Sequence, residues 1–206
     1  CSRPAVNKLR EPLAVLVEQL SGLPGMGRKS ALRMALTLLK WPEDTARGLG
    51  QSILDLRDSL RVCRVCFCLS DTDPCSICDD PNRSDTELCL VSDWDALLVM
   101  EESGFFRGRY LVLGGLLSPL DGVQPQNLEI DRLRDRLSQG VVEELILALG
   151  TTLEAEATES FLKNMLARQF PDMRLSRLAQ GIPLGSDLKY VDRETLKQSL
   201  VHRQRL

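Results

Sequence analysis

Four cysteines with the spacing C-x2-C-x8-C-x2-C could bind one metal ion between them. They are Cys63, Cys66, Cys75 and Cys78. Each C-x-x-C turn presents two sulfurs to one point, and two such turns supply the tetrahedral thiolate set that Zn²⁺ takes in structural sites. The loop between the pairs is short and is polar and turn-forming towards its end, so that the segment has little core of its own and bound zinc would hold it together. The spacing therefore predicts a structural zinc finger.

The alternative for these cysteines is a set of disulfides or of unrelated buried thiols. The chain has seven cysteines, an odd number, and carries neither a secretory signal nor a long apolar run. Both features disfavour an oxidised extracellular framework. Cys68 lies between the two pairs and is left out of the predicted ligand set, whereas Cys1 and Cys89 are interpreted as incidental or core thiols. The first residue is Cys1 rather than methionine, which predicts a trimmed chain.

A second group of residues suited to chemistry surrounds Gly25 and Gly27. Residues 1–40 contain seven Lys and Arg side chains and two acids, a charge of +5, whereas the remainder of the chain carries −8 of the total of −3. Such a basic end on an acidic body indicates a localised polyanion site. The glycines permit positive φ and a close approach of the backbone to a ligand. Arg28, Lys29 and Arg33 follow at once, the last two on one helical face, and the predicted ligand is phosphate.

Two helices are predicted to position these residues. Leu13, Leu16, Val17 and Leu20 repeat at i, i+3, i+4, i+7 after Pro12, and the same period recurs from Leu32 to Leu39. The second helix begins just after the glycines, where unpaired N–H groups and a partial positive charge attract anions. The alternative is an ordinary helical hairpin whose charges are merely solvated.

Strand and helix patterns alternate from Leu88 onward. The predicted strands cover residues 88–91, 109–113, 144–149 and 173–178, and the predicted helices between them cover residues 95–103, 128–137 and 154–169. Strands separated by helices imply right-handed crossovers and a mainly parallel sheet. The fold class predicted is therefore mixed α and β, with an N-terminal helical hairpin, a zinc finger and an α/β domain.

The residues that could serve covalent catalysis are few. Tyr110 lies in an apolar strand pattern and Tyr190 follows a loop, and both are interpreted as packing residues. His202 is the single histidine and lies in a basic tail, so that no buried nucleophile and base pair is indicated. The segment from Gly25 to Ser30 lacks the Walker spacing, which disfavours ATP hydrolysis. Apolar runs are far shorter than the roughly 20 residues that a membrane crossing needs.

The hairpin resembles the helix-hairpin-helix motif of DNA-repair proteins, which binds DNA phosphates without reading sequence. A helix-hairpin-helix followed by a four-cysteine finger of this spacing resembles the RecR family of bacterial recombination mediators. Three further segments resemble the same family. Residues 117–123 are similar to its S-P-L-D-G segment, and residues 154–158 are similar to its E-G-E-A-T, with Ala155 in place of the glycine. Residues 181–188 are similar to its G-[LIV]-P-x-G-G-[DE]-L, with Ser186 in place of the second glycine of the G-G pair.

The resemblance implies a Toprim domain, whose relatives coordinate Mg²⁺ through a glutamate after the first strand and a later acidic pair. Glu154 and Glu156 match the pair, but Ser92 stands where the family usually has glutamate, and Asp93 follows one residue later. Two carboxylates in place of three predict a weakened Mg²⁺ site unless Asp93 substitutes. The alternative interpretation is that Glu154 favourably begins a helix and Glu156 is simply exposed.

The resemblance divides the chain into residues 1–59 as the helix-hairpin-helix domain, 60–82 as the zinc finger, 83–177 as the Toprim domain and 178–206 as a C-terminal oligomerisation segment. It implies a non-catalytic, ring-forming DNA-binding adaptor, commonly a homotetramer, in the bacterial cytoplasm near the nucleoid. The implied partners are single- and double-stranded DNA, bound without sequence preference, and RecO and RecF, with which it loads recombinase on gapped DNA. The alternatives are a Mg²⁺-dependent Toprim nuclease or primase-like enzyme, and a zinc adaptor that binds only proteins.

Overall fold

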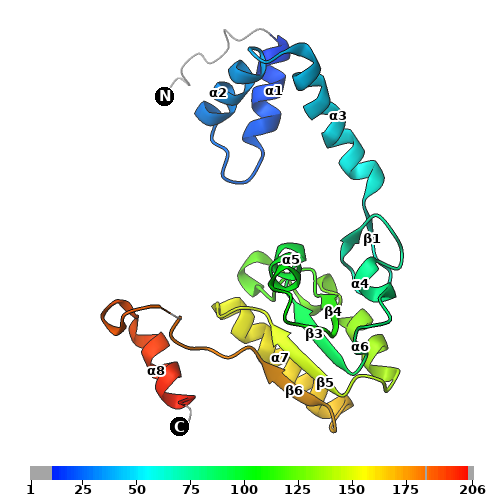
Figure 1. The fold of residues 1–206 in the computed structure, drawn as a ribbon. Helices are drawn as coiled ribbons and strands as arrows, with labels where there is room; N and C mark the ends of the chain where they lie inside the picture. Colours follow the sequence, from blue (N-terminus) through cyan, green and yellow to red (C-terminus); the bar gives the residue numbers. More distant parts are fainter. Residues whose placement is uncertain (1–10, 184, 204–206) are drawn as a thin grey trace. The chain divides into compact units, whose positions relative to one another are not determined.

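The computed structural model describes residues 11–183 and 185–203 of the 206-residue chain (Figure 1). It divides into two compact units, with the boundary between Ser59 and Leu60. Cys1 lies outside the described ranges, as do Arg3, Lys8 and Arg10, three of the seven cations counted in the basic segment.

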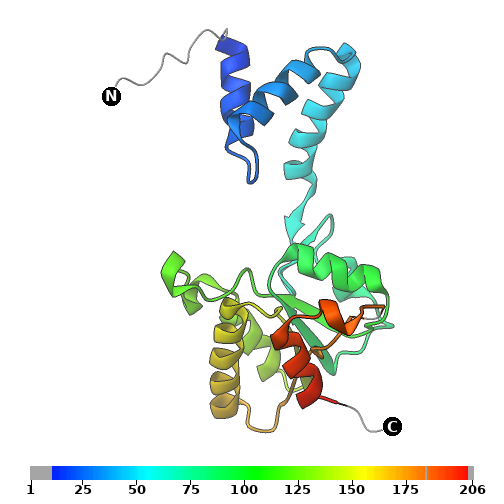
Figure 2. The same cartoon turned by 90° about the vertical axis from the view of Figure 1, so that its left-hand side faces the viewer.

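Three helices form the first unit: α1 (Glu11–Ser21), α2 (Arg28–Leu38) and α3 (Glu43–Ser59). The first two match the predicted amphipathic pair and lie side by side (Figures 1 and 2). Their shared core is small, with Val17, Ala31 and Ala35 fully buried. Two alanines at the contact let the helix backbones approach closely, which holds the connecting loop in a tight hairpin.

Helix α3 is not among the predicted elements, although Leu49, Ile53 and Leu56 repeat at i, i+4, i+7 and its first turn carries ordinary helix signals. It follows Pro42 and has Glu43 and Asp44 in its first turn, where negative charge is favourable to the helix dipole, whereas Arg57 and Asp58 offset one another in its last turn. None of its residues is buried within this chain. Its apolar side chains, Leu49, Ile53, Leu54 and Leu56, are all exposed.

The zinc-finger segment opens the second unit. Strands β1 (Arg61–Val62) and β2 (Leu69–Ser70) pair antiparallel, and a short helix α4 (Ser76–Asp79) follows. The strands are too short to form a stable hairpin by themselves in water. Packing and the cysteines must therefore supply the stability of this segment.

A four-stranded parallel sheet forms the centre of the second unit, as the sequence predicts. Its strands are β3 (Glu87–Val91), β4 (Arg109–Val112), β5 (Glu144–Ala148) and β6 (Arg174–Arg177), in the spatial order β4-β3-β5-β6. All three strand pairs are parallel. Helices α5 (Trp94–Ser103), α6 (Ile130–Ser138) and α7 (Leu153–Gln169) make the crossovers. The mixed α and β fold class is confirmed.

The two faces of the sheet pack against different elements of the chain, because successive strand residues point to opposite sides. One face packs against α6 and α7, through residues that include Leu88, Leu90, Leu111, Leu145 and Leu147 on the strands. The opposite face packs against α5 and the zinc finger, through Cys89, Val91, Tyr110, Val112 and Ala148. Cys89 is a fully buried core thiol, as predicted, and burial raises its pKa to about 12.

The remaining elements are short 3-10 turns (Pro119–Asp121, Pro125–Asn127 and Leu188–Tyr190) and the last helix, α8 (Arg193–Val201). Tyr110 is buried, as predicted, but the packing role predicted for Tyr190 is wrong within this chain, since Tyr190 is 81% exposed. Its ring lies 4.9 Å from the Lys189 ammonium. None of the helices in the described part of the chain combines the length and apolar character that a bilayer crossing requires.

The buried hydroxyl of Thr158 ties α7 to the loop that follows β4. It accepts a hydrogen bond from the Leu117 amide (2.9 Å) and donates one to the Glu154 carbonyl (2.6 Å). Thr158→Val keeps the shape but leaves the Leu117 amide without its partner, so we expect it to lower the free energy of unfolding by about 1–3 kcal/mol, measured in urea. The exposed Thr151→Val is the control, and equal effects of the two changes would contradict a role for the buried hydroxyl.

Candidate zinc centre and nucleic-acid interface

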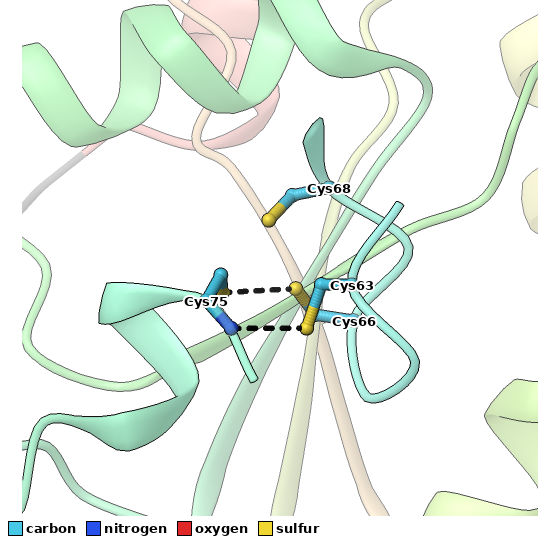
Figure 3. Close-up of side chains that lie close together, drawn as sticks. All are labelled: Cys63, Cys66, Cys68 and Cys75. Carbon is cyan, nitrogen blue, oxygen red and sulfur yellow. Dashed lines mark hydrogen bonds between the residues drawn. The ribbon is translucent and has the colours of Figure 1, made fainter. Parts of the chain in front are cut away.

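Four buried cysteines converge on one point between the finger and the sheet (Figure 3). They are Cys63, Cys66, Cys68 and Cys75, and their sulfur atoms all lie within 4.8 Å of one another. The Cys66 and Cys75 sulfurs are 3.5 Å apart, and the Cys75 amide donates to the Cys63 sulfur at 3.4 Å. Amide donors of this kind stabilise thiolates and are common around structural zinc.

The predicted ligand Cys78 lies on α4 and is only partly buried. Its amide donates to the Cys75 sulfur at 3.4 Å, so that Cys75 caps this short helix. The structure therefore brings three of the four predicted ligands together with Cys68, and Cys78 adjoins that group. All five cysteines of the finger are free thiols.

Close contact among the thiols shifts their pKa values in opposite directions. The pKa of Cys75 is lowered, mainly by a hydrogen bond with Cys66 and next by one with Cys68. The pKa of Cys66 is also lowered, mainly by a hydrogen bond with Cys68. Hydrogen bonds with Cys66 and then Cys75 raise the pKa of both Cys68 and Cys78. Without a cation so many thiolates would repel one another, and a bound divalent metal lets the ligands deprotonate together.

The dimensions of the cluster fit a structural zinc site. In a tetrahedron with Zn–S bonds near 2.3 Å the sulfurs are separated by about 3.8 Å, close to the spacings observed here. Zinc bound there would cross-link the loop between β1 and β2 to the start of α4. All-thiolate coordination also closes the metal to substrate, which is typical of a structural ion rather than a catalytic one.

Phe67 fixes the turn that carries the cysteines and joins the finger to the sheet. It is the one described residue other than glycine with positive φ (63°), a conformation that costs free energy unless its surroundings hold it. The Trp94 indole donates to the Phe67 carbonyl (2.9 Å), and the Arg132 guanidinium lies 5.3 Å from the ring centre. The Val112 amide also donates to the Cys66 carbonyl (2.8 Å). The finger is therefore packed on the sheet rather than tethered beside it.

The helical hairpin presents its loop backbone to solvent. Gly25 adopts positive φ (76°), and a Cβ at either Gly25 or Gly27 would meet nothing within 4 Å. Gly27 has an extended backbone instead (φ −77°) and is the N-cap of α2, where no side chain caps the helix. The amides of the first turn of α2 are consequently available to a ligand, and phosphate as that ligand stays a prediction.

Arg28, Lys29 and Arg33 are exposed on α2, and none of them forms an ion pair with a described acid. Lys29 and Arg33 line a shallow groove of about 270 Å³, together with Lys40. The sequence places Lys40 in the basic segment but does not assign it to the predicted phosphate site. Its position seven residues after Arg33, two helical turns on, is the signal that could have found it.

Of the acids predicted for the Toprim site, Glu154 and Glu156 lie near one another because both are in the first turn of α7. Glu154 and Glu156 are exposed in the first turn of α7, where negative charge is favourable to the helix dipole. Asp93 caps α5 by accepting from the Ala96 amide (3.3 Å), which commits its side chain to the helix end. Among the described residues, the single cluster of three or more metal-ligating side chains is that of the cysteines.

A helical hairpin with exposed cations, an all-cysteine zinc centre and a Toprim-like parallel sheet define a zinc-stabilised, multi-domain protein of nucleic-acid metabolism. Comparisons with known proteins identify the family. Residues 13–57 match the RecR helix-hairpin-helix family, residues 60–80 the four-cysteine zinc finger domain of RecR, residues 86–179 the Toprim domain and residues 181–204 the RecR C-terminal family.

Comparison of the whole chain with other proteins identifies the same family. The chain is 58% identical over 201 residues to recombination protein RecR of Nitratidesulfovibrio vulgaris, covering 98% of this chain and 100% of that protein. It is 42% identical to the RecR of Desulfatibacillum aliphaticivorans, with 91% and 94% covered, and 39% identical to that of Francisella tularensis subsp. novicida, with 92% and 94% covered. The chain belongs to the RecR family, and its four-cysteine finger is a structural zinc site.

Proposed function

We propose that this protein is a non-catalytic recombination mediator that binds DNA through the hairpin between α1 and α2. The observation that carries the proposal is that Arg28, Lys29 and Arg33 are exposed and have no acid partner in the described part of the chain, beside a helix N-terminus that no side chain caps. Backbone amides and cations recognise phosphate, which is the same for every base sequence. Binding without sequence preference suits a protein that must act wherever DNA is gapped.

A homotetrameric ring supplies the affinity that one hairpin lacks. Each hairpin offers only a few phosphate contacts, whereas several hairpins around one DNA molecule sum them. The exposed apolar side chains of α3 and the C-terminal segment are surfaces suited to such assembly. An assembled ring also encircles DNA, so that it stays bound through weak individual contacts.

We propose that the Toprim region contacts partner proteins and does not catalyse a reaction. Glu154 and Glu156 stand exposed at the start of α7, and Ser92 and Asp93 do not restore the missing third carboxylate ligand. An exposed acidic helix end is suited to contact a basic protein surface. We assign RecO and RecF to this face, in keeping with the family, and loading of recombinase on gapped DNA as the outcome.

Native mass spectrometry with and without DNA tests the proposal. We expect a tetramer, binding to single- and double-stranded oligonucleotides of unrelated sequence, and no strand cleavage or synthesis with Mg²⁺. A monomer that fails to bind DNA would contradict it. Mg²⁺-dependent cleavage or synthesis that disappears in Glu156→Ala would instead show a Toprim enzyme.

A further inference from the structure

The finger contains five cysteines, although a tetrahedral zinc ion takes four. Cys63, Cys66 and Cys75 belong both to the set that the sequence spacing predicts and to the set whose sulfurs lie within 4.8 Å of one another. The fourth member differs, because spacing indicates Cys78 and geometry indicates Cys68. The two candidates flank the same three thiols, Cys68 from the strand β2 side and Cys78 from α4.

Cys68 is placed at the metal position by the local backbone. The left-handed turn at Phe67 reverses the chain directly before it, and the Cys63 amide donates to the Cys68 carbonyl at 2.8 Å. The Phe67 amide in turn donates to the Cys63 carbonyl at 2.9 Å. The Cys68 side chain is only 4% exposed, and its sulfur faces those of the other three cysteines (Figure 3).

Cys78 has weaker anchoring. It is only partly buried and lies on a helix of a single turn. Its backbone amide donates a hydrogen bond to the Cys75 sulfur, and its thiol interacts with those of Cys66 and Cys75. A small rotation of so short a helix would move the Cys78 sulfur relative to the thiols of Cys63, Cys66 and Cys75. Neither candidate is therefore excluded from the fourth position by the surrounding backbone.

We propose that the zinc centre of this protein has three fixed ligands, Cys63, Cys66 and Cys75, and a fourth position that Cys68 and Cys78 can each fill. The site then holds a complete thiolate set after loss of either of the two. The same arrangement allows one thiol to replace the other on the metal without release of zinc, since the incoming and outgoing sulfurs share the three fixed partners. The incoming thiol gives up its proton as it binds, and the outgoing thiolate takes one up.

The test is the zinc content of full-length variants purified in parallel, together with the visible spectrum after Co²⁺ substitution. We expect Cys68→Ser and Cys78→Ser each to retain about one metal ion per chain with a four-thiolate tetrahedral spectrum. The double variant Cys68→Ser/Cys78→Ser is expected to lose most of its metal, because only three thiols remain. Cys89→Ser, which alters a buried thiol outside the cluster, is the matched control and should keep its zinc.

Three outcomes would overturn the proposal. Loss of zinc or of soluble protein in Cys78→Ser, with Cys68→Ser unaffected, would show that Cys68 cannot serve. The reverse result would show that Cys68 is an obligatory ligand and Cys78 a bystander. Full zinc in the double variant would show that neither thiol is required.

Discussion

Replacement of the first cysteine pair, Cys63→Ser/Cys66→Ser, is expected to abolish zinc binding and to unfold the finger. Both thiols are fully buried, and only three cysteines remain near the site, so no four-thiolate set can form. A structural zinc ion contributes on the order of 10 kcal/mol, which is comparable with the whole stability of a typical domain, about 5–15 kcal/mol. We expect the thermal midpoint to fall by more than about 10 °C.

The damage should extend beyond the finger, because the same cluster covers one face of the sheet. Cys63 and Cys66 pack in one core with Val91, Leu97 and Val112, and unfolding of the finger exposes that face. Hydrogen exchange should therefore show lost protection in β3 and β4 as well as in the finger. Metal analysis and calorimetry of the variant measure the primary effect.

Cys89→Ala is the control for this prediction. It removes an equally buried sulfur from the same face of the sheet, outside the thiol cluster. We expect a cavity cost of about 1–2 kcal/mol and unchanged zinc content. A first-pair variant that keeps its zinc and its thermal midpoint would refute a structural role for the metal.

The second large effect is expected from Lys29→Ala/Arg33→Ala. These cations line the same groove on α2 and have no acid partner among the described residues, so their charge is free to attract phosphate. Near 0.1 M salt we expect DNA affinity to fall at least about tenfold. The slope of log K against log salt should become shallower by about 0.9 for each phosphate that the variant no longer neutralises.

The matched control is Lys163→Ala/Arg168→Ala. It removes the same two charges from exposed positions on α7, in the other unit of the chain. Anisotropy titrations over a range of salt distinguish the two variants. Equal DNA affinity and equal salt slope for wild type and the Lys29/Arg33 variant would rule out this helix as the DNA-contacting surface. The same loss in both variants would indicate a nonspecific effect of net charge.

Local pattern predicts most of the architecture. The i, i+3, i+4 repeat before and after Gly25 locates α1 and α2 within a few residues, and apolar runs separated by helical patterns indicate a parallel sheet. Helix α3 is not predicted, although Leu49, Ile53 and Leu56 repeat at i, i+4, i+7. What the repeat does not tell is that this apolar stripe is exposed rather than buried in this chain. The prediction for Tyr190 fails for a related reason, since a residue's type does not say whether a partner surface covers it.

The residue types that define this protein can be read from its sequence: paired cysteines suited to zinc, glycines and cations suited to phosphate, and a Toprim acid set in which Ser92 replaces one glutamate. Which of these side chains meet depends on the folded chain. It brought Cys68 beside three predicted ligands through the turn at Phe67, and it packed the finger against the sheet through Trp94 and Arg132. Spacing specifies the order of ligands along a chain, whereas convergence depends on backbone dihedrals and on contacts between residues far apart in sequence.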